Sequence, residues 1–488
     1  MHLEKLIENV EYENTLSEED LALEIEALVT DSRRQVENGL FFCLTGGTSD
    51  GHLYAAEAVR NGCVAVVTER RLALNVAQIP VKSTRKALAE ISSVFHGKPS
   101  EGLKMIGVTG TNGKTTTAYM LASILRNAGK KTGIIGTLGV RYEGKERPSD
   151  LTTPDPVELQ AILADMRKHG VEYVVMEVSA HALYYDKVEG IVFQACIFTN
   201  LTQDHLDFFE NMSDYKAAKK KLFEKVRCNL AILNGDDEVG REIAKAREEA
   251  GAQSTVYGMQ TPTDAFAIVT EESLLGSECV LNIDDRLSRI SLAMLGRHNV
   301  YNALAAATCA ANLGIPMRAI AKGLTELKGV EGRLERVCAY NGADIFVDFA
   351  HTPDGLGKSL DALRPHCRGR LVCLFGCGGN RDKTKRPLMG ETVAKKSDFA
   401  VLTSDNPRYE DPLDIISEIE KGYRRFSVCY VVVPDRRHAI DYALDSLREG
   451  DLLLVAGKGG EHYQEIMGIK YPFNDHDIIE KLLEKKGK

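Results

Sequence analysis

The sequence predicts an α/β protein of three domains. Its 488 residues exceed what one hydrophobic core normally holds, at roughly 150 residues per domain. Short apolar strands alternate with helix-length segments along most of the chain, which is typical of a mostly parallel sheet covered by helices. A charged, glycine-containing segment at 329–336 (GVEGRLER) interrupts this alternation, and the pattern then begins again. These observations divide the chain into domains at 1–100, 101–332 and 333–488.

Each domain has its own strands. In the first, apolar strands are expected at 40–44 (LFFCL) and 64–68 (VAVVT), between helical stretches. In the second, longer units carry the buried strands MIGVT, YVVMEVS and ACIFTN, which predict a central domain built on a mostly parallel sheet. In the third, strand and helix alternate through DIFVDF, RLVCLFG, FAVLTS, CYVVV and DLLLVAG, which indicates a Rossmann-like domain.

Composition and charge exclude several classes of protein. Lys and Arg number 61 and Asp and Glu 70, a net charge of −9, so no broad basic field favours nucleic acid or an anionic membrane. No apolar run reaches the roughly 18 residues that a membrane helix requires. The first residues carry acids where a signal peptide needs a basic region, so no signal peptide is expected, and the eleven scattered cysteines do not suggest a disulfide framework. We expect a reduced, cytoplasmic protein that is not inserted in a membrane.

A phosphate loop is the strongest single motif. TGTNGKTTT (109–117) follows the strand MIGV and precedes a helix-like segment, the context that a phosphate loop requires. Its backbone N–H groups can close on phosphate oxygens, Lys114 supplies a positive charge, and the Thr115 hydroxyl suits Mg²⁺. Val108 stands where the strict pattern has its first glycine. A glycine turn that only caps a helix is the alternative, but the coincidence of strand, loop and helix favours ATP binding.

Polar residues follow the next two apolar strands of the predicted central sheet. Glu177, Ser179 and His181 come after YVVM, and Asp204, His205 and Asp207 come after ACIFTN. Ligands of open α/β sheets bind at the carboxyl ends of strands, so Glu177 and His205 are expected near the γ-phosphate. Mg²⁺ prefers oxygen ligands, which suits Thr115 and Glu177, whereas His205 could equally be a capping or supporting residue.

One lysine lies on an apolar helix face. In SDYKAAKKKLFEKV, a helical period aligns Lys219 with four apolar residues, while the other lysines point elsewhere; the four are Tyr215, Ala218, Leu222 and Phe223. Burial lowers the pKa of a lysine and favours a neutral amine, which could react with CO₂ to form a carbamate, an anionic metal ligand. The alternative is a lysine at the edge of the stripe whose ammonium reaches solvent.

Together these motifs resemble the ATP-dependent Mur ligases of peptidoglycan synthesis. The resemblance rests on TGTNGKTT, TTPD (152–155), MEVSAHAL, TNLTQDHLD, YKAAKKKLF and GRHNVYNALAA (296–306). VTDSRR, DGHLYA, DFAHTPDGL, GCGGNRDKTKRP, SDNPR (404–408) and AGKGGE (456–461) are similar to the branch of the family that adds the third amino acid of the peptide. The resemblance extends through nearly the whole chain.

The resemblance implies an ATP-dependent ligase that requires Mg²⁺ and acts through an acyl phosphate. An amine then attacks the acyl phosphate to give an amide, ADP and phosphate. Lys114, Lys219 and His205 are the implied catalytic residues; Thr115, Glu177, His205 and carbamylated Lys219 would hold metal ions. The implied ATP contacts are Thr109, Gly110, Thr111, Asn112, Gly113, Lys114, Thr115, Thr116 and Asn302. Asn302 could instead be a polar residue in the first turn of a helix.

The resemblance also assigns residues to a UDP-N-acetylmuramoyl-L-alanyl-D-glutamate substrate. Ser32 matches a residue that contacts the UDP end, although a serine in a turn is the simpler reading of the residue alone. Thr152, Thr153, Ser179 and Lys187 match positions that hold the muramoyl-dipeptide. Many relatives carry Arg at position 187. Lys187 keeps the positive charge but cannot make the bidentate hydrogen bonds of a planar guanidinium.

The added amino acid is expected to be meso-2,6-diaminopimelate. It differs from L-lysine by one distal carboxylate, which Arg408 could bind through two parallel hydrogen bonds from its guanidinium. SDNPR resembles the motif that recognises diaminopimelate in the family, whereas a solvated turn arginine is the alternative for Arg408 alone. The implied contacts are Arg381, Asp405, Asn406, Pro407, Arg408, Gly457 and Glu461. Gly460 stands where many relatives have His.

The residues leave two alternative functions open. The first is the L-lysine-adding form of the same ligase, against which Arg408 argues. The second is a P-loop ATPase switch or binding protein, which would not need the carboxylate-handling residues of the third domain. The resemblance further implies a role in cell wall biogenesis, and through it in cell shape, cell division and the cell cycle. We expect small-molecule substrates, no nucleic acid partner and a monomer.

Overall fold

The computed structural model describes residues 1–13, 16–46, 49–224, 226 and 228–487. These residues form two compact units. The first contains Met1–Gly107, Lys130–Cys196 and Ala218–Leu230, and the second contains Val108–Gly129, Ile197–Ala217 and Ala231–Lys488. No helix among the described residues is long and apolar enough to cross a membrane. All eleven cysteines are described, and each is a free thiol.

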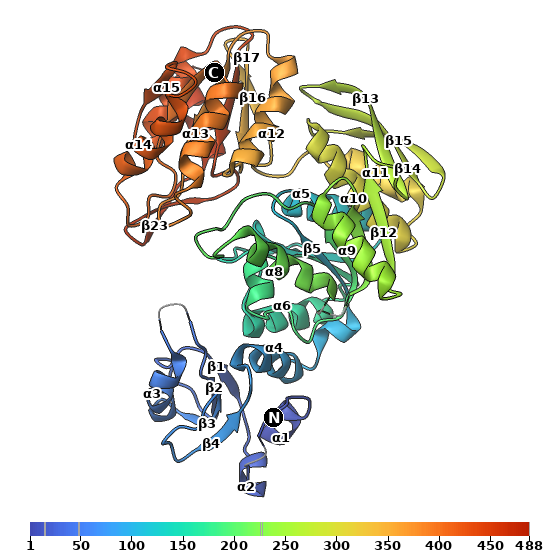
Figure 1. The fold of residues 1–488 in the computed structure, drawn as a ribbon, viewed down its shortest axis with the longest axis vertical. Helices are drawn as coiled ribbons and strands as arrows, with labels where there is room; N and C mark the ends of the chain where they lie inside the picture. The colour runs from blue at the N-terminus through green and yellow to red at the C-terminus, as the bar shows by residue number, and fades with distance from the viewer. Residues whose placement is uncertain (14–15, 47–48, 225, 227, 488) are drawn as a thin grey trace. The chain divides into compact units, whose positions relative to one another are not determined.

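The amino-terminal part is built on a four-stranded parallel sheet in the order β1-β2-β3-β4 (Figure 1). Its strands are β1 (Ala27–Val29), β2 (Gly39–Phe42), β3 (Cys63–Thr68) and β4 (Ala77–Pro80). Its helices are α1 (Leu3–Ile7), α2 (Glu18–Leu21), η1 (Gly51–Tyr54), α3 (Ala55–Arg60), α4 (Thr84–Phe95) and η2 (Pro99–Gly102). Alternate residues of β2 pack on opposite faces, with Leu40 and Phe42 in one core and Phe41 in the other. The strands expected at 40–44 and 64–68 are confirmed within two residues at each end.

The largest sheet has eleven strands in the order β15-β14-β13-β12-β11-β10-β5-β9-β6-β7-β8. Its strands are β5 (Lys104–Thr109), β6 (Thr132–Gly136), β7 (Gly139–Tyr142), β8 (Lys145–Arg147), β9 (Tyr173–Glu177), β10 (Phe193–Phe198), β11 (Cys228–Asn234), β12 (Ser254–Gly258), β13 (Ala265–Ser273), β14 (Gly276–Ile283) and β15 (Arg286–Leu292). The accompanying helices are α5 (Lys114–Asn127), α6 (Pro156–Lys168), α7 (Ala180–Tyr184), α8 (Met212–Glu224), α9 (Glu238–Glu249), α10 (Arg297–Asn312) and α11 (Met317–Glu326). The expected strands MIGVT, YVVMEVS and ACIFTN correspond to β5, β9 and β10.

The strands at both edges of this sheet pair antiparallel, whereas the sequence predicted a mostly parallel sheet. β6 pairs with β7 and β7 with β8 at one edge, and β13 pairs with β14 and β14 with β15 at the other, all antiparallel. Asp284 and Asp285, between β14 and β15, both have positive φ, 51° and 59°. Two successive residues with positive φ make the tight turn whose twist matches a β-hairpin, and Asp tolerates that conformation better than most residues.

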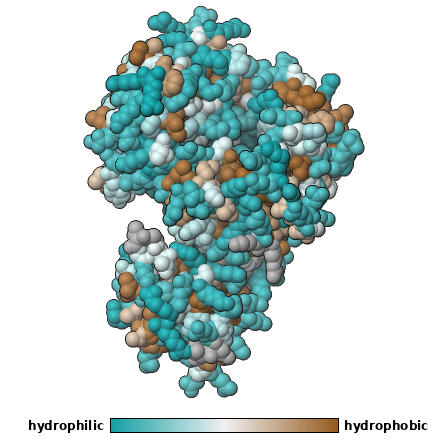
Figure 2. Space-filling model, viewed as in Figure 1, coloured by the Kyte–Doolittle hydropathy of each residue, from teal (hydrophilic) through white to brown (hydrophobic). Residues whose placement is uncertain are grey.

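One face of the β13–β15 region exposes apolar side chains. Phe266, Ile268 and Leu287 are 37%, 56% and 68% exposed, respectively, while Ala265 and Ala267 on the other face are buried. Figure 2 shows hydrophobic residues gathered over this region, at the upper right of the molecule. The alternation along β13 is the period of two that a half-buried antiparallel strand requires.

The carboxyl-terminal part is a six-stranded sheet in the order β16-β17-β21-β18-β19-β20, parallel except for the pair β16 and β17. Its strands are β16 (Glu335–Tyr340), β17 (Ala343–Asp348), β18 (Leu371–Phe375), β19 (Phe399–Leu402), β20 (Tyr430–Val432) and β21 (Leu452–Ala456), followed by the hairpin β22 (Tyr463–Ile466) and β23 (Ile469–Pro472). Its helices are α12 (Pro353–Leu363), η3 (Arg364–His366), α13 (Lys385–Lys396), α14 (Pro412–Tyr423), α15 (Arg436–Ser446) and α16 (Asp475–Lys485). All five strands expected after residue 333 are present.

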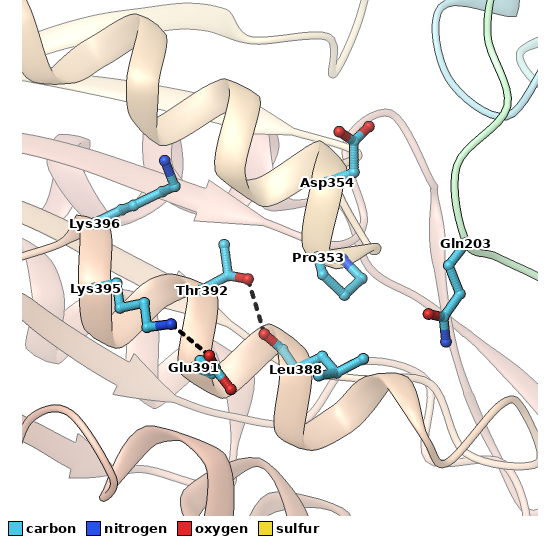
Figure 3. A pocket seen from close by; sticks show the side chains of 8 residues that line it. All are labelled: Gln203, Pro353, Asp354, Leu388, Glu391, Thr392, Lys395 and Lys396. Atoms are coloured by element: carbon cyan, nitrogen blue, oxygen red, sulfur yellow. Dashed lines mark hydrogen bonds and ion pairs between the residues drawn. The ribbon is translucent and has the colours of Figure 1, made fainter. Parts of the chain in front are cut away.

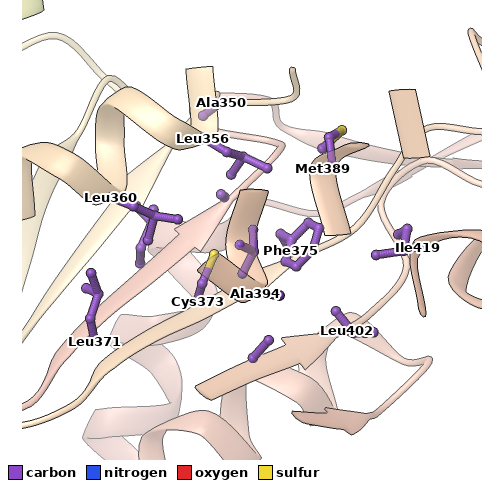
Figure 4. Close-up of a cluster of buried hydrophobic side chains, with 14 of the residues drawn as sticks. Ala350, Leu356, Leu360, Leu371, Cys373, Phe375, Met389, Ala394, Leu402 and Ile419 are labelled. Carbon is purple, nitrogen blue, oxygen red and sulfur yellow. The ribbon is translucent and has the colours of Figure 1, made fainter. Parts of the chain in front are cut away.

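Helices cover both faces of this sheet. Leu371, Cys373 and Phe375 of β18 pack with residues of α12, α13 and α14, a cluster drawn in Figure 4. Val372 and Leu374 of the same strand pack with residues of α15 and α16 on the opposite face. A strand that is buried on both faces has a continuous apolar sequence, and LVCLF of β18 is such a sequence. The Rossmann-like expectation for this domain is confirmed.

Candidate functional site

The phosphate loop lies between β5 and α5, where the sequence predicts it. Gly113 precedes the helix with a φ of 85°, a conformation that favours glycine. A Cβ on Gly110 would lie 1.9 Å from Thr199 Oγ1, and a Cβ on Gly113 would lie 2.3 Å from Asn302 Oδ1. Both positions therefore require glycine, and the loop presents backbone N–H groups at a helix amino terminus, where anions bind.

Lys114 lies over this loop. Its Nζ donates to the carbonyl oxygens of Gly110, at 3.0 Å, and Thr111, at 2.9 Å. Thr111 is itself buried, and its hydroxyl donates to the carbonyl oxygen of Thr202. Thr109 and Thr116 are buried beside the loop. The ammonium is thus positioned at the loop that would receive the phosphate groups of a nucleotide.

A second cation reaches the loop from the segment before β16. Arg333 Nη2 donates to Thr115 Oγ1 at 2.9 Å, and its guanidinium carbon lies 4.3 Å from the centre of the Phe349 ring. The sequence pattern of 329–336 indicates only a domain boundary, and no local motif marks Arg333 as a site residue. A positively charged group is therefore accommodated beside the Thr115 hydroxyl.

Asn302 is buried against the phosphate loop. It is 6% exposed, its Oδ1 accepts from Thr117 Oγ1 at 3.3 Å, and its Nδ2 donates to Asn299 Oδ1 at 3.2 Å. Helix α10 begins at Arg297, so Asn302 lies in the second helical turn, and the alternative of a first-turn residue is wrong. The predicted contact between Asn302 and adenine stays a prediction.

Asp204 is buried at the centre of a charged cluster whose two histidines are partly exposed. His205 Nε2, His351 Nε2 and Lys385 Nζ lie 3.4, 3.6 and 3.5 Å, respectively, from its carboxylate oxygens. Burial alone would raise the pKa of Asp204, but the hydrogen bond from His351 and the charges of its neighbours hold that pKa well below its usual value. His205, at a positive φ of 57°, is therefore held beside a carboxylate.

Lys219 is fully enclosed on α8. Its exposed fraction is 1%, and the four other residues of the predicted stripe are also buried. The alternative of an ammonium that reaches solvent at the edge of the stripe is therefore wrong. Lys216, off the stripe, is about one-third exposed and pairs with Glu242. Burial favours the neutral form of a lysine, so the position of Lys219 is compatible with the carbamate that the sequence suggested.

Glu177 ends β9 and is fully buried. Its Oε1 accepts from the Thr137 backbone N at 2.9 Å, and its Oε2 accepts from Thr137 Oγ1 at 3.2 Å. A Cβ on Gly136 would lie 2.1 Å from Glu177 Oε1, so this close approach depends on glycine. The carboxylate is held rigidly at the carboxyl end of its strand, as expected.

The predicted dipeptide residues lie around Glu177. Thr152 Oγ1 is 3.2 Å from Thr137 Oγ1, and Thr153 Oγ1 donates to the carbonyl oxygen of Glu177 at 2.8 Å. Ser179 accepts from the Ala182 backbone N and so caps α7. Thr153 and Ser179 also contact each other through their hydroxyl groups, at 3.4 Å.

Two further predicted substrate residues lie in this unit. Lys187 Nζ pairs with Asp155 Oδ1 of the TTPD segment at 2.7 Å, and its side chain is 12% exposed. Ser32 is 8% exposed, and its hydroxyl donates to Glu57 Oε2 at 2.6 Å. Ser32 therefore lies in a turn, as the simpler reading of the residue has it, and its hydroxyl is bonded to a residue of α3.

In the carboxyl-terminal part, Asn406 and Glu461 are joined by a buried lysine. Lys458 is fully buried, and its Nζ donates to Asn406 Oδ1 at 3.0 Å and to Glu461 Oε2 at 2.9 Å. Asn406 Nδ2 also donates to Glu461 Oε2, at 2.9 Å. Burial alone would raise the pKa of Asp405, but the charges of Lys458 and Arg436 lower it. Lys458 was not among the predicted site residues, although it lies inside the AGKGGE segment.

Arg408 is fixed by its own segment and by the hairpin β22–β23. Its Nε donates to Glu465 Oε2 at 3.0 Å, and its Nη1 donates to the carbonyl oxygen of Gly379 at 2.8 Å. A Cβ on Gly378 would lie 3.0 Å from Arg408 Nη1, and a Cβ on Gly379 would lie 1.9 Å from the carbonyl oxygen of Pro407. Arg408 is thus enclosed by glycine backbone, and the alternative of a solvated turn arginine is wrong.

Gly457 lies against Asp405, and Arg381 is less enclosed. A Cβ on Gly457 would lie 2.4 Å from Asp405 Oδ2, and its φ of 115° also favours glycine. The Arg381 side chain is 52% exposed, with Nη1 3.9 Å from Asp207 Oδ2. The structure therefore brings the DNPR and AGKGGE segments together, while Arg381 keeps freedom to move.

A separate cavity of about 270 Å³ lies beside α12 and α13 (Figure 3). Two of its lining residues, Lys395 and Glu391, pair with each other at 2.5 Å. Asp354, at the start of α12, also lines it and accepts from Asn112 Nδ2 of the phosphate loop at 2.8 Å. None of the predicted site residues lines this cavity, so it carries no part of the predicted chemistry.

Among the described residues, no group of three or more His, Cys, Asp or Glu side chains is arranged to hold a metal ion. Mg²⁺ does not require such a group, because it commonly keeps several waters and binds one or two carboxylates together with substrate phosphates. The Thr115 hydroxyl and the buried Glu177 carboxylate are oxygen donors of this kind. Each of these two residues is therefore of a chemical kind that fits Mg²⁺.

The sequence is similar to curated proteins over its whole length. It is 42% identical to the UDP-N-acetylmuramoyl-L-alanyl-D-glutamate--2,6-diaminopimelate ligase of Syntrophomonas wolfei subsp. wolfei, and the match covers 100% of both chains. The chain belongs to the Mur ligase family. The Mur ligase middle domain matches residues 108–310, the Mur ligase glutamate ligase domain matches 332–459, and the Mur ligase family catalytic domain matches 24–96.

Solved Mur ligases share the fold of this Mur ligase. A UDP-N-acetylmuramoyl-L-alanyl-D-glutamate--2,6-diaminopimelate ligase matches with a TM-score of 0.70 and 27% identity, over 100% of this chain and 99% of that chain. The MurF ligase of Thermotoga maritima, solved in complex with ADP, matches with a TM-score of 0.63 and 19% identity, over 94% of this chain and 97% of that chain. The three-domain α/β fold class is thereby confirmed.

Proposed function

We propose that this Mur ligase adds meso-2,6-diaminopimelate to UDP-N-acetylmuramoyl-L-alanyl-D-glutamate at the expense of ATP. The full-length match to a ligase of that name carries the proposal. The enclosed position of Arg408 supports it, because an arginine held by glycine backbone suits a distal carboxylate. The product belongs to peptidoglycan synthesis, and through it to the cell cycle, cell division and cell shape.

The chemistry proceeds in two steps on the substrate carboxylate. That carboxylate attacks the γ-phosphorus of ATP, forming an acyl phosphate and releasing ADP. The amine of the amino acid then attacks the acyl carbon, and phosphate leaves as the amide forms. Both steps bring anions together, so positioning and charge neutralisation are the main requirements. Lys114 and the loop N–H groups meet these requirements at the phosphates, and Arg333 adds a positive charge beside Thr115.

We propose Thr115 and Glu177 as ligands of a first Mg²⁺, and His205 with carbamylated Lys219 as ligands or organisers of a second. Bound Mg²⁺ would neutralise charge on the γ-phosphate and the incoming carboxylate. For the carbamate, neutral Lys219 Nζ adds to the carbon of CO₂ and releases one proton. The product is an anion on a side chain that would otherwise be a buried cation, and its 1% exposure supports this chemistry.

The remaining assignments rest on the resemblance of these positions to those of the family. Thr152, Thr153, Ser179 and Lys187 hold the muramoyl-dipeptide, and Ser32 contacts the UDP end. Asn302 contacts the adenine of ATP. Asn406, Arg408 and Glu461 bind the amino acid, together with Arg381, Asp405, Pro407 and Gly457. We further propose domain boundaries near residues 100 and 332, a monomer and a cytoplasmic location, where ATP is available.

Replacing Arg408 by Ala tests the proposed amino acid. The variant is expected to raise the KM for diaminopimelate about a hundredfold, because a buried carboxylate loses its charged partner. The KM for ATP should change less than twofold. Steady-state kinetics with each substrate varied in turn measure both. Arg424→Ala, which removes an exposed arginine paired with Glu420, is the matched control. Equal changes in both KM values for Arg408→Ala would contradict the assignment.

A further inference from the structure

The guanidinium of Arg408 already has a carboxylate partner on the protein. Arg408 Nε donates to Glu465 Oε2 at 3.0 Å, and the two side chains are 17% and 21% exposed, respectively. Both residues are therefore largely enclosed but still reachable. The protein presents a cation and an anion side by side, in place of the single cation that the sequence predicted.

The backbone fixes this pair in place. Arg408 N donates to the carbonyl oxygen of Glu465 at 3.0 Å, and Met467 N donates to the carbonyl oxygen of Arg408 at 2.7 Å. Glu465 N donates to Asn406 Oδ1 at 2.9 Å. Arg408 adopts a positive φ of 51°, which directs its side chain away from the normal strand direction. The first strand of the β22–β23 hairpin is thus joined to the DNPR segment by bonds that do not involve the Glu465 carboxylate.

A paired arginine selects its ligand differently from an isolated one. A ligand that offers only a carboxylate must compete with Glu465 for the guanidinium and is repelled by the Glu465 charge. A ligand that carries an ammonium beside its carboxylate satisfies both protein charges. The distal centre of meso-diaminopimelate is an α-amino acid and has this arrangement. Lysine offers the ammonium alone, and 2-aminopimelate offers the carboxylate alone.

We propose that Glu465 is a specificity-determining residue, which binds the ammonium of the distal centre while Arg408 binds the carboxylate of the same centre. This inference rests on the proposed function. Glu461 is the other carboxylate nearby, but its Oε2 already accepts from Lys458 and Asn406, and the buried ammonium of Lys458 balances its charge. Glu465 touches Arg408 directly, so it lies beside whatever Arg408 binds.

Glu465→Gln tests the inference, because it keeps the side-chain shape and all the backbone bonds of the hairpin. The measured quantity is the ratio of kcat/KM for meso-diaminopimelate to kcat/KM for L-2-aminopimelate on the same protein sample. Any inactive fraction cancels in this ratio, so a loss of folded protein cannot imitate the effect. Loss of one charge-assisted bond corresponds to about tenfold to hundredfold, and the ratio should fall by that factor.

The individual values of KM and kcat/KM for each substrate give a second test. The KM for diaminopimelate should rise, kcat/KM for 2-aminopimelate should stay the same or rise, and the KM for ATP should be unchanged. Glu465→Asp, which keeps the charge but withdraws it by one methylene, should give an intermediate ratio. Glu420→Gln is the matched control, since Glu420 also pairs with an arginine, Arg424, outside this site. It should leave the ratio at the wild-type value.

Three outcomes would overturn the inference. In the first, Glu465→Gln leaves kcat/KM unchanged for both substrates. In the second, Glu465→Gln lowers kcat/KM equally for both substrates. In the third, Glu461→Gln lowers the ratio while Glu465→Gln does not. The last result would assign the ammonium to Glu461. Failure of the proposed function looks different, because the wild-type protein itself would then form no amide with diaminopimelate.

Discussion

Arg333 donates a hydrogen bond to the Thr115 hydroxyl, 2.9 Å away, and so places a guanidinium at the start of the phosphate-loop helix. The two residues are more than two hundred positions apart in the sequence. Because Thr115 is an expected ligand of the Mg²⁺ that accompanies the phosphates of ATP, we expect the guanidinium to lie near the negative charge that accumulates during phosphoryl transfer.

Arg333→Ala is therefore expected to lower kcat by about a hundredfold to a thousandfold, the usual effect of removing one charged donor from a transition state. The KM for diaminopimelate should change little. Initial rates of ADP release under saturating substrates measure the effect. Arg336→Ala is the matched control, because Arg336 pairs with Asp344 at a partly exposed position nearby. A similar loss in both variants would show that Arg333 acts only on folding.

Lys219→Ala is expected to reduce activity by at least about a hundredfold, because the proposed carbamate would be lost from the metal site. Formate or acetate should restore part of the activity, since either can place a carboxylate in the space of the missing side chain. Activity assays with and without these ions measure the rescue.

Intact mass of the unacidified wild-type protein should show one added carboxyl group on Lys219. Lys216→Ala is the matched control, because Lys216 is on the same helix but pairs with Glu242 outside the apolar stripe. An active Lys219→Ala variant together with an unmodified wild-type mass would disprove the carbamate.

Lys458→Met should weaken amino acid binding and lower stability. The substitution leaves Glu461 without its buried cation, and since Glu461 remains partly exposed we expect a loss of about 2 kcal/mol in the free energy of unfolding. The KM for diaminopimelate should rise about tenfold, and the KM for ATP should not change. Thermal unfolding and steady-state kinetics measure the two effects, with Lys421→Met on the exposed face of α14 as control. A stable variant with normal KM values would contradict the positioning role of Lys458.

Glu410 should make the carboxyl-terminal domain sensitive to acid. The hydrogen bonds from the buried Arg386 lower the pKa of Glu410 to about 2, below its ordinary value of 4.5. A lowered pKa contributes stability above the ordinary pKa, and that stability is lost as the pH falls toward 2. The contribution is on the order of 2 kcal/mol after allowance for partial exposure.

Urea unfolding of wild type and Glu410→Gln at pH 7 and pH 3 tests this expectation. The difference in stability between the two proteins should shrink at pH 3, because the Glu410 carboxyl is then almost fully protonated in the unfolded state but still mostly ionised in the folded state. Glu420→Gln, which replaces a carboxylate of the same domain that pairs with the exposed Arg424, should show no such change. A difference that is the same at both pH values would contradict the pairing of Glu410 with Arg386.

Local patterns in the sequence predicted the parts of the site that depend on neighbouring residues. The phosphate loop is recognisable because Gly113, Lys114 and Thr115 must be adjacent to turn a strand into a helix around an anion. Lys219 is recognisable because helical periodicity alone places it among apolar residues. The burial of Lys219 was confirmed, and the loop lies between β5 and α5 as predicted.

Contacts made through tertiary folding were not predictable from one sequence. Arg333, Lys458 and Glu465 stand in segments whose local pattern indicates only a boundary, a glycine loop and a short strand. Their roles depend on partners brought close by the fold, such as Thr115 for Arg333. The antiparallel pair β14 and β15 was missed for a different reason, because the turn at 284–285 uses two aspartates in place of the more familiar Asn-Gly pair.

The most direct test of the central claim is amide formation by the purified protein with ATP, Mg²⁺ and UDP-N-acetylmuramoyl-L-alanyl-D-glutamate, with meso-diaminopimelate or L-lysine supplied in parallel. Mass spectrometry of the products identifies which amino acid has been joined. The tripeptide containing diaminopimelate should form, at a rate at least about a hundredfold above any lysine product, because lysine leaves Arg408 without a carboxylate. Product with lysine alone, or ATP hydrolysis that is independent of any amino acid, would contradict the proposed function.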